Sequence, residues 1–344
     1  MLNQLRVAIL GAGKIAELGH LPGYARAGAA LVALCDTNAD ALQRLGDEHQ
    51  IDRRHTDWRE LLAMGGFDAV SICTPPSLHA EMAVASLQNG YHVLVEKPMA
   101  LTLAACDQMI EAARKANKLL MVSHNQRFAA RHVIAKHILD SGRLGRPYAA
   151  RATFAHGGPE NWSPGQTWYF DAGPATQGVM ADLGSHKIDL LRWLLDQEVT
   201  EVSAFGATFE KATQADDTAV LSLRFSGGTL ASIYVSWAQR PRMTDDVTIQ
   251  CEKGTLLVPT DASEPVRVLE SGQAGAVDES VYAFEAAGEP GWSAAVAAFV
   301  DAVTMHKQSP VSGADGRSTM AAVLAAYDAL ANKRVVQVLP PARE

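Results

Sequence analysis

The chain has 344 residues, of which 48% are hydrophobic and 20% charged, a composition typical of a globular protein long enough for two domains. Its formal net charge of -8 argues against a nucleic-acid partner or an anionic membrane surface, because both would repel it. The four cysteines lie far apart without metal or redox spacing, which predicts buried thiols in a reducing compartment. The N-terminus carries no signal-peptide pattern, and no apolar stretch approaches the ~20 residues of a membrane span. We therefore expect a cytoplasmic protein.

The first 124 residues alternate short apolar strands with helical stretches, which predicts a parallel sheet with right-handed crossovers. Strand 6–10 runs directly into Gly11-Ala-Gly-Lys-Ile-Ala16, a G-x-G-x-x-G/A pattern in the strand–turn–helix setting of dinucleotide-binding sites. Gly11 permits the tight turn, and Gly13 lets the backbone approach a pyrophosphate at the helix N-terminus. The cofactor contacts expected from this loop are Gly11, Gly13, Lys14 and Ile15.

A second strand, 30–35, ends in Asp36, close to the ~20 residues beyond the glycine pattern where a ribose-binding acid is expected. Its carboxylate can accept hydrogen bonds from both ribose hydroxyls, and it would repel a 2′-phosphate. No Arg or Lys follows before Arg44, so NAD is favoured over NADP. Asp36 could also act as a cap for the helix expected from residue 38, and the two roles are compatible.

The next two strands each end in residues that could meet a ligand. Strand 69–73 is followed by Thr74-Pro-Pro-Ser-Leu-His79, and strand 91–95 by Glu96-Lys97-Pro98. Open α/β sheets bind ligands at the carboxyl ends of their strands, and Pro98 would present Lys97 from a stiff corner. The alternative for Lys97 alone is a solvated loop lysine. Helices are expected near 57–63 and over 78–88 and 102–116, with a further strand at 119–123.

After residue 124 strands dominate, and we expect a mostly antiparallel sheet. The segments Asp217–Ser226 and Thr229–Trp237 alternate around the turn signal Gly227-Gly228. The face predicted to be buried carries Ala219, Leu221, Leu223, Phe225, Ala231, Ile233, Val235 and Trp237. The opposite face carries Leu230, Ser232, Tyr234 and Ser236, a mixture that predicts an oligomer interface. Further strands are expected at 147–156, 201–209, 246–251, 254–259 and 334–338, helices at 130–140, 293–306 and 316–332, and a loop insertion at 261–291.

One helix of this second region, 180–195, carries polar residues on one face. At 100° per residue Asp182, His186 and Asp189 fall within about 60° of one another, opposite a face of leucines. An Asp and a His at i and i+4 can form a pair in which the carboxylate orients the ring. Gly184 would leave room beside them. A metal site, a buried structural pair, and a general acid or base working with Lys97 all remain open for this cluster.

These segments resemble the Gfo/Idh/MocA family of oxidoreductases over nearly the whole chain. The resemblance rests on Gly11–Ala16, Thr74–His79, Glu96-Lys97-Pro98, Asn125-Gln-Arg-Phe128 and Asp182-Leu-Gly-Ser-His186. It implies an N-terminal Rossmann domain (1–124) with a doubly wound parallel sheet. It also implies a C-terminal α+β domain (125–344) with a large open, mostly antiparallel sheet, through which the chain would form a homodimer or homotetramer. A Lys97-Pro98 bond that is commonly cis is a further implication.

The resemblance also implies roles for single residues. Lys97 resembles the family's catalytic lysine, His186 its proton-transfer histidine, and Asp182 the acid four residues earlier. The positions matching the cofactor lining are Thr74, Pro75, His79, Glu96, Lys97 and Asn125. Thr176-Gln-Gly178 departs from the family's common Gly-Gly-Gly, which bears on the shape of the substrate entrance.

The activity implied is reversible oxidation of a secondary alcohol on a sugar, sugar derivative or cyclitol, with NAD as cofactor. His186 would take the hydroxyl proton, Asp182 would steady the imidazolium, and Lys97 would stabilise the alkoxide as hydride passes to nicotinamide. Further substrate contacts are expected from Arg127, His156 and Trp168. Alternatives are an oxidation–elimination glycosidase or lyase, and a non-catalytic NAD-binding regulator, which would have no reason to keep an acid–base pair.

Overall fold

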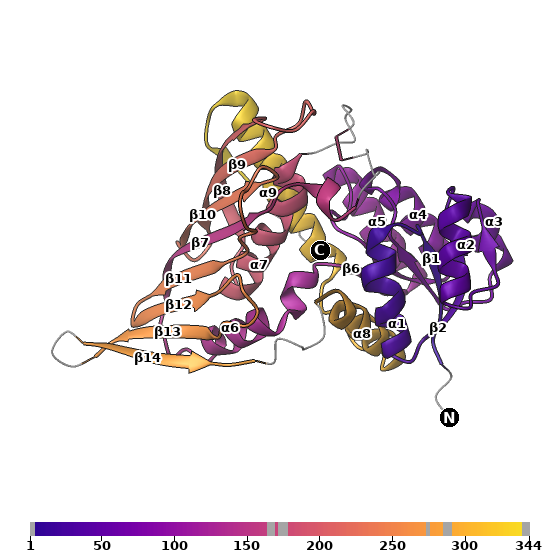
Figure 1. Cartoon of the computed structure of the whole chain (residues 1–344), viewed down its shortest axis with the longest axis horizontal. Coiled ribbons are helices and arrows are strands. Elements are labelled where there is room, and N and C mark those ends of the chain that lie inside the picture. Colours follow the sequence, from indigo (N-terminus) through magenta and orange to yellow (C-terminus); the bar gives the residue numbers. More distant parts are fainter. Residues whose placement is uncertain (1–3, 164–168, 171–177, 273–275, 285–290, 339–344) are drawn as a thin grey trace. The chain divides into compact units, whose positions relative to one another are not determined.

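The computed structural model describes residues 4–163, 169–170, 178–272, 276–284 and 291–338 (Figure 1). Contacts divide the chain into two compact units, which are residues 1–125 with 289–317, and 126–288 with 318–344. The first break lies within one residue of the boundary expected after residue 124. The segment 289–317 differs from expectation, because it groups with the first unit. The cause is the packing of α8 (Gly291–Thr304) on α1 (Leu21–Arg26), where a Cβ on Gly23 would lie 2.9 Å from the Val296 Cβ.

The first unit is built on a parallel sheet, as predicted. Among the described residues it has six strands in the order β3-β2-β1-β4-β5-β6, the doubly wound order of dinucleotide-binding folds. The strands are β1 (Arg6–Leu10), β2 (Ala30–Cys35), β3 (Arg54–His55), β4 (Ala69–Ile72), β5 (His92–Val95) and β6 (Leu120–Val122). The order reverses between β1 and β4, and the central strands are buried on both faces. The carboxyl ends of β1, β2, β4 and β5 therefore converge where such folds bind ligands.

Helices connect these strands. They are α1, α2 (Ala39–Glu48), α3 (Trp58–Met64), α4 (Pro76–Gln88) and α5 (Leu103–Ala116). Three of these five begin at a side-chain cap, namely α2, α3 and α5. The side chain of Asn38 accepts a hydrogen bond from the Ala41 N–H at 3.1 Å and caps α2, while Thr102 caps α5 in the same way. The glycine loop leads into a five-residue π-helical stretch, η1 (Ala16–His20), before α1. Sequence periodicity did not predict that stretch.

The second unit carries a sheet that is antiparallel except for the β10–β7 pair. Its order in the described residues is β14-β13-β12-β11-β7-β10-β9-β8-β15. The strands are β7 (Pro147–Ala155), β8 (Val199–Ala207), β9 (Thr218–Phe225), β10 (Leu230–Ser236), β11 (Val247–Cys251), β12 (Gly254–Val258), β13 (Val266–Ser271), β14 (Val277–Tyr282) and β15 (Val336–Gln337). The predicted loop insertion at 261–291 was wrong in part, because it contains β13 and β14, which pair with each other.

Helices cover one face of this sheet and leave the other open (Figure 1). The helices are α6 (Ala130–Asp140), η4 (Met180–Gly184) with α7 (Ser185–Leu195), and α9 (Gly313–Asn332). The predicted buried face is confirmed, since all eight of its side chains on β9, β10 and Trp237 are at most 8% exposed. On the open face Leu230 is 49% exposed, but Ser236 is buried and its hydroxyl lies 2.8 Å from that of Thr218. No helix within the described residues is long and apolar enough to cross a membrane.

Candidate functional site

The glycine loop after β1 is locked against two neighbouring strands. Gly11 has φ +100°, and a Cβ there would lie 2.7 Å from the carbonyl carbon and oxygen of Cys73. Its own N–H donates to the carbonyl oxygen of Cys35 at 2.8 Å. Only glycine fits this combination of conformation and contact, because any side chain would strike the backbone after β4. The loop is thereby fixed at the switch point of the sheet.

Asp36 lies where the sequence predicted a ribose-binding acid, directly after β2. One carboxylate oxygen accepts from the Ala12 N–H at 2.6 Å, and the other accepts from the Asn38 N–H at 2.8 Å. The acid thus orders the glycine loop and the start of α2 together. Asn38, rather than Asp36, is the helix cap, so the carboxylate remains beside the loop where a ribose would bind.

Lys14, Ile15 and Asn125 are three further predicted cofactor contacts. Lys14 lies 3.3 Å from Glu17, while Ile15 is half-buried at the start of the helix. Asn125 begins the short 3-10 helix η2 (Asn125–Phe128), and its buried Oδ1 meets no donor among the described residues. A buried acceptor of this kind suits a ligand that brings its own donor. Together with the loop amides and Asp36, it fits a dinucleotide.

The corner that carries Lys97 is anchored by a buried chain of hydrogen bonds. The Lys97–Pro98 peptide bond is cis. The Lys97 N–H donates to one oxygen of Glu96 at 3.2 Å, and the other oxygen lies 2.9 Å from His20 Nε2. His20 Nδ1 lies 2.7 Å from the Ser71 hydroxyl. Burial alone would lower the pKa of His20, but Cys73 and Glu96 raise it to about 10, so a protonated ring faces the carboxylate.

His79 joins the turn after β4 to the same corner. Its Nε2 lies 2.8 Å from the carbonyl oxygen of Thr74, and its Nδ1 lies 2.9 Å from that of Pro98. Burial lowers the pKa of His79, so a neutral ring donates to one carbonyl at a time. Pro75 is the N-cap residue of α4. His79 therefore holds the Thr74 turn and the Lys97 corner in a fixed relation.

In the second unit Asp182 lies in η4, a π-helical stretch, and His186 lies in the first turn of α7. The 100° rule used for residues 180–195 does not hold across η4, because a π turn contains an extra residue. Asp182 accepts from the indole N–H of Trp237 at 3.1 Å. The ring of His186 packs edge-on against Phe154, with centroids 5.6 Å apart. The direct Asp182–His186 pair stays a prediction.

Asp189, predicted on the same face, has a different partner. It receives two hydrogen bonds from the guanidinium of Arg127, at 2.8 and 2.6 Å, and both side chains are buried. This bidentate pair ties η2 to α7. The pair gives Arg127 a structural role, and its predicted substrate contact stays a prediction. A Cβ on Gly184 would meet nothing closer than 3.8 Å, so there is room beside the helix.

Sequence reasoning missed a buried ionic cluster that begins at Lys187, the residue after His186. The Nζ of Lys187, fully buried, lies 2.5 Å from Asp245 Oδ1, and Arg131 pairs with the other oxygen. Gln126 also donates to this carboxylate, at 3.2 Å. A signal was present, because Lys187 is the one charged residue on the leucine face of the predicted helix. Its partner, Asp245, could not be identified from the sequence.

Aromatic residues and His156 gather around the same helix. His156 Nδ1 accepts from the Gly158 N–H at 3.0 Å, and its ring lies 5.9 Å from that of Phe154. Tyr169 packs edge-on against Trp237 with centroids 6.2 Å apart. Trp168, a predicted substrate contact, lies outside the described residues, as do Thr176 and Gln177.

A doubly wound sheet with a glycine loop after β1 and an acid after β2 is the fold of an NAD-binding oxidoreductase. Residues 5–124 match the family described as oxidoreductase family, NAD-binding Rossmann fold, and residues 132–257 match the GFO/IDH/MocA C-terminal domain. The chain therefore belongs to the Gfo/Idh/MocA family of dehydrogenases and reductases, and its cofactor is NAD.

Similar proteins cover almost the whole chain. Myo-inositol 2-dehydrogenase from Thermotoga maritima is 27% identical, with 97% of this chain and 98% of the relative covered. A 1,5-anhydro-D-fructose reductase from Ensifer adhaerens is 28% identical, with the same coverage of 97% and 98%. The crystal structure of an oxidoreductase from Agrobacterium radiobacter, in complex with NAD+, L-tartaric acid and magnesium, is 26% identical. It superposes with a TM-score of 0.84 over 98% of this chain and 99% of that one.

Proposed function

We propose that the chain reversibly oxidises a secondary alcohol of a sugar, sugar derivative or cyclitol, with NAD as hydride acceptor. The observation that carries this proposal is the similarity, over 97% of the chain, to relatives named as a cyclitol dehydrogenase and an anhydrosugar reductase. Both names describe interconversion of a ring alcohol and a ketone. The same reaction on a related ring is therefore the simplest activity for this chain.

Each unit contributes chemistry that this reaction needs. NAD, when bound, supplies the hydride acceptor. Lys97 brings an ammonium group that stabilises the developing alkoxide. His186 takes the hydroxyl proton, and Asp182, held by the Trp237 indole, stabilises the imidazolium. The proposed cofactor contacts are Gly11, Gly13, Lys14, Ile15, Asp36, Thr74, Pro75, His79, Glu96, Lys97 and Asn125.

Supporting polar groups fix these side chains in advance. The Glu96–His20 pair holds the backbone of Lys97, and the Lys187–Asp245 pair anchors the helix turn after His186. Fixed geometry matters because a group that must reorganise during reaction contributes less to the rate. Each of these buried pairs holds its own part of the proposed machinery, the Lys97 corner in the first unit and the turn after His186 in the second.

Substitution of Lys97 by Ala tests the assignment. Turnover should fall by about 10²–10³, the loss typical of removing one electrostatic stabiliser of an oxyanion, while NADH binding changes little. The matched control is Lys115→Ala, because Lys115 is 70% exposed and pairs only with nearby Glu111 on α5. Turnover within a few-fold of the parent in Lys97→Ala would contradict the role.

A substrate screen tests the reaction itself. NADH formation should appear with at least one member of a panel of inositols, aldoses and anhydrosugars. Glycosides belong in the same panel, because an oxidation–elimination enzyme would cleave them with no net NADH. Cleavage without NADH accumulation would therefore replace the proposed dehydrogenase by that alternative.

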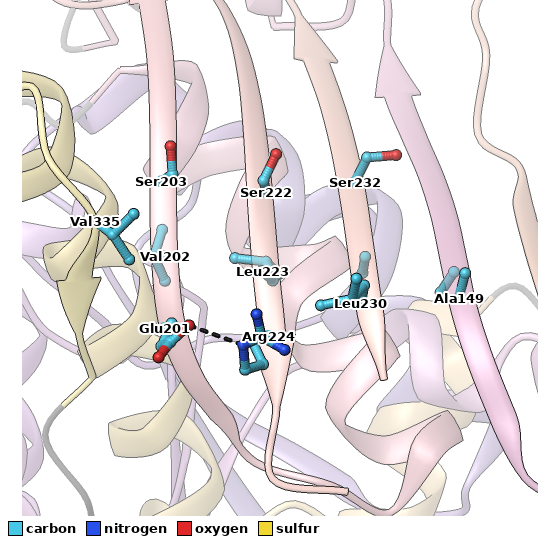
Figure 2. Close-up of a pocket in the computed structure, with 12 residues that line it drawn as sticks. Ala149, Glu201, Val202, Ser203, Ser222, Leu223, Arg224, Leu230, Ser232 and Val335 are labelled. Atoms are coloured by element: carbon cyan, nitrogen blue, oxygen red, sulfur yellow. Dashed lines mark hydrogen bonds and ion pairs between the residues drawn. The ribbon is translucent and has the colours of Figure 1, made fainter. Parts of the chain in front are cut away.

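We also propose that the open sheet face forms the subunit interface of a homodimer or homotetramer in the cytoplasm. Phe205, Val220 and Leu230 expose 77%, 45% and 49% of their surface on this face. Figure 2 shows Leu230 near Glu201 and Arg224, which form an ion pair. Exposed apolar side chains on a flat sheet favour association. Sedimentation should show an oligomer that Val220→Asp dissociates, whereas Met64→Asp should not, because Met64 is also exposed, at 63%, but lies on α3 of the first unit. A monomeric parent at micromolar concentration would contradict the interface.

A further inference from the structure

A single carboxylate, that of Glu17, binds two cations beside the glycine loop. Arg44 donates to both of its oxygens, at 3.0 and 3.1 Å, and Lys14 Nζ lies 3.3 Å from one of them. The side chains of Glu17, Arg44 and Lys14 are 23%, 52% and 33% exposed. All three side chains of the cluster are therefore accessible from solvent.

The cluster lies next to the ribose-binding acid. Asp36 accepts from the Ala12 N–H at 2.6 Å. Lys14 is two residues beyond Ala12 in the same loop, so the Cα atoms of Ala12 and Lys14 are at most ~7 Å apart. NADP differs from NAD by a phosphate on the adenosine 2′-hydroxyl, which is the group that an acid after β2 accepts. Such a phosphate would lie beside Asp36 and the glycine loop, whose Lys14 shares the carboxylate of Glu17 with Arg44.

We propose that Glu17 is a coenzyme-specificity residue, which withholds Lys14 and Arg44 from the 2′-phosphate of NADP. Arg44 is eight residues beyond Asp36 and would otherwise be a suitable phosphate ligand, because a guanidinium binds phosphate through two parallel hydrogen bonds. Two carboxylates, those of Asp36 and Glu17, would then exclude NADP. Asp36 repels the phosphate directly, and Glu17 neutralises the cations that would compensate.

The state of Glu17 supports this role. Hydrogen bonds from Arg44 lower the pKa of Glu17, with Lys14 acting in the same direction, so the carboxylate stays ionised at neutral pH. An exposed ion pair contributes little to folding, so removal of the charge should leave the unit intact. The alternative is a simple tether between the first helix and α2. That alternative predicts no change in coenzyme preference.

Direct titration of NADH and NADPH by fluorescence tests the proposal on the full chain. Asp36→Ser should weaken NADH and improve NADPH binding. Adding Glu17→Gln should improve NADPH binding by about a further tenfold without a matching change for NADH, since two cations become available to the phosphate. The gain should weaken steeply with added salt.

Two further variants make the result decisive. Arg44→Ala in the double-variant background should remove most of the NADPH gain. Glu48→Gln, which removes a more distant partner of Arg44 at 3.7 Å, should change neither affinity. NADPH affinity that is unaffected by Glu17→Gln, or a gain that survives Arg44→Ala, would overturn the proposal. These titrations need no turnover, so they stand apart from any failure of the proposed sugar oxidation.

Discussion

Replacing Asp245 by Asn should strongly destabilise the second unit. Asp245 lies between the Lys187 ammonium, 2.5 Å away, and the guanidinium of Arg131, and the Lys187 side chain is fully buried. Asparagine keeps the shape and can still accept from Gln126, whose Nε2 lies 3.2 Å from the carboxylate. The substitution therefore removes charge while leaving the packing almost unchanged.

The expected loss in free energy of unfolding arises because the Lys187 ammonium stays buried without its carboxylate. Removing one partner of a buried ion pair costs ~3–5 kcal/mol, because the other charge stays buried without compensation. Burial already lowers the pKa of Lys187, so in the variant the ammonium can release its proton, at ~1.4 kcal/mol per pH unit. We therefore expect a loss near ~3 kcal/mol at pH 7. The loss should shrink as pH rises towards the ~10.4 of an unfolded lysine, where both states are neutral.

A double-mutant cycle isolates the charge pair. Lys187→Met in the Asp245→Asn background should recover much of the loss, with a coupling energy of ~2 kcal/mol or more, measured by urea unfolding. The control is Asp140→Asn on α6, because the Asp140 carboxylate is 53% exposed and its pair with Lys136 should be worth less than ~0.5 kcal/mol. Additive effects of Lys187→Met and Asp245→Asn would refute the reasoning.

Three further outcomes follow from single contacts. Burial lowers the pKa of His132 to about 3, so the unfolded chain takes up a proton near pH 6.5 that the folded chain does not. Stability should fall as pH drops from 6.5 towards 3, by up to ~1.4 kcal/mol per pH unit, and urea unfolding of His132→Gln should show a shallower slope. Trp237→Phe removes the indole donor 3.1 Å from Asp182 and should lower kcat about tenfold or more while shifting its pH profile; an unchanged profile would count against the contact. Gly11→Ala should abolish NADH binding in a fluorescence titration, whereas Gly28→Ala, with nothing within 4 Å, should not.

Periodicity was sufficient to predict most strands of both sheets. The alternation on β9 and β10 reflects burial of one face only, and the continuous apolar runs of β1, β4 and β5 reflect burial of both. The pair β13–β14 was missed because β14 is largely exposed and carries polar residues on both sides. Its order comes instead from pairing with β13, and from Arg143, which contacts Glu270 and the Tyr282 hydroxyl. Such contacts leave no periodic signal.

The residues expected to bind ligand stay predictions, drawn from short sequence segments of fixed spacing. The side chains that hold those residues in place could not be predicted in this way. Trp237 is 55 positions from Asp182, and His20 is 76 positions from Glu96, so each contact depends on the folded topology. The place of Lys187 on an apolar helix face could have marked it as a buried charge, but a single sequence does not specify which carboxylate neutralises it.

His20 and Asp182 each lie in a π-helical stretch, His20 in η1 of the first unit and Asp182 in η4 of the second. A π turn holds one residue more than an α turn, so it rotates the following side chains relative to those before it. In η1 this brings the last residue, His20, to Glu96; in η4 it brings Asp182 to the Trp237 indole. A π turn loses the regular i to i+4 backbone hydrogen bonds of an α-helix. A hydrogen bond to a charged side chain, worth ~1.5–3 kcal/mol, offsets that loss. The irregular backbone and the supporting side chain therefore depend on each other, which is why helical periodicity alone could predict neither.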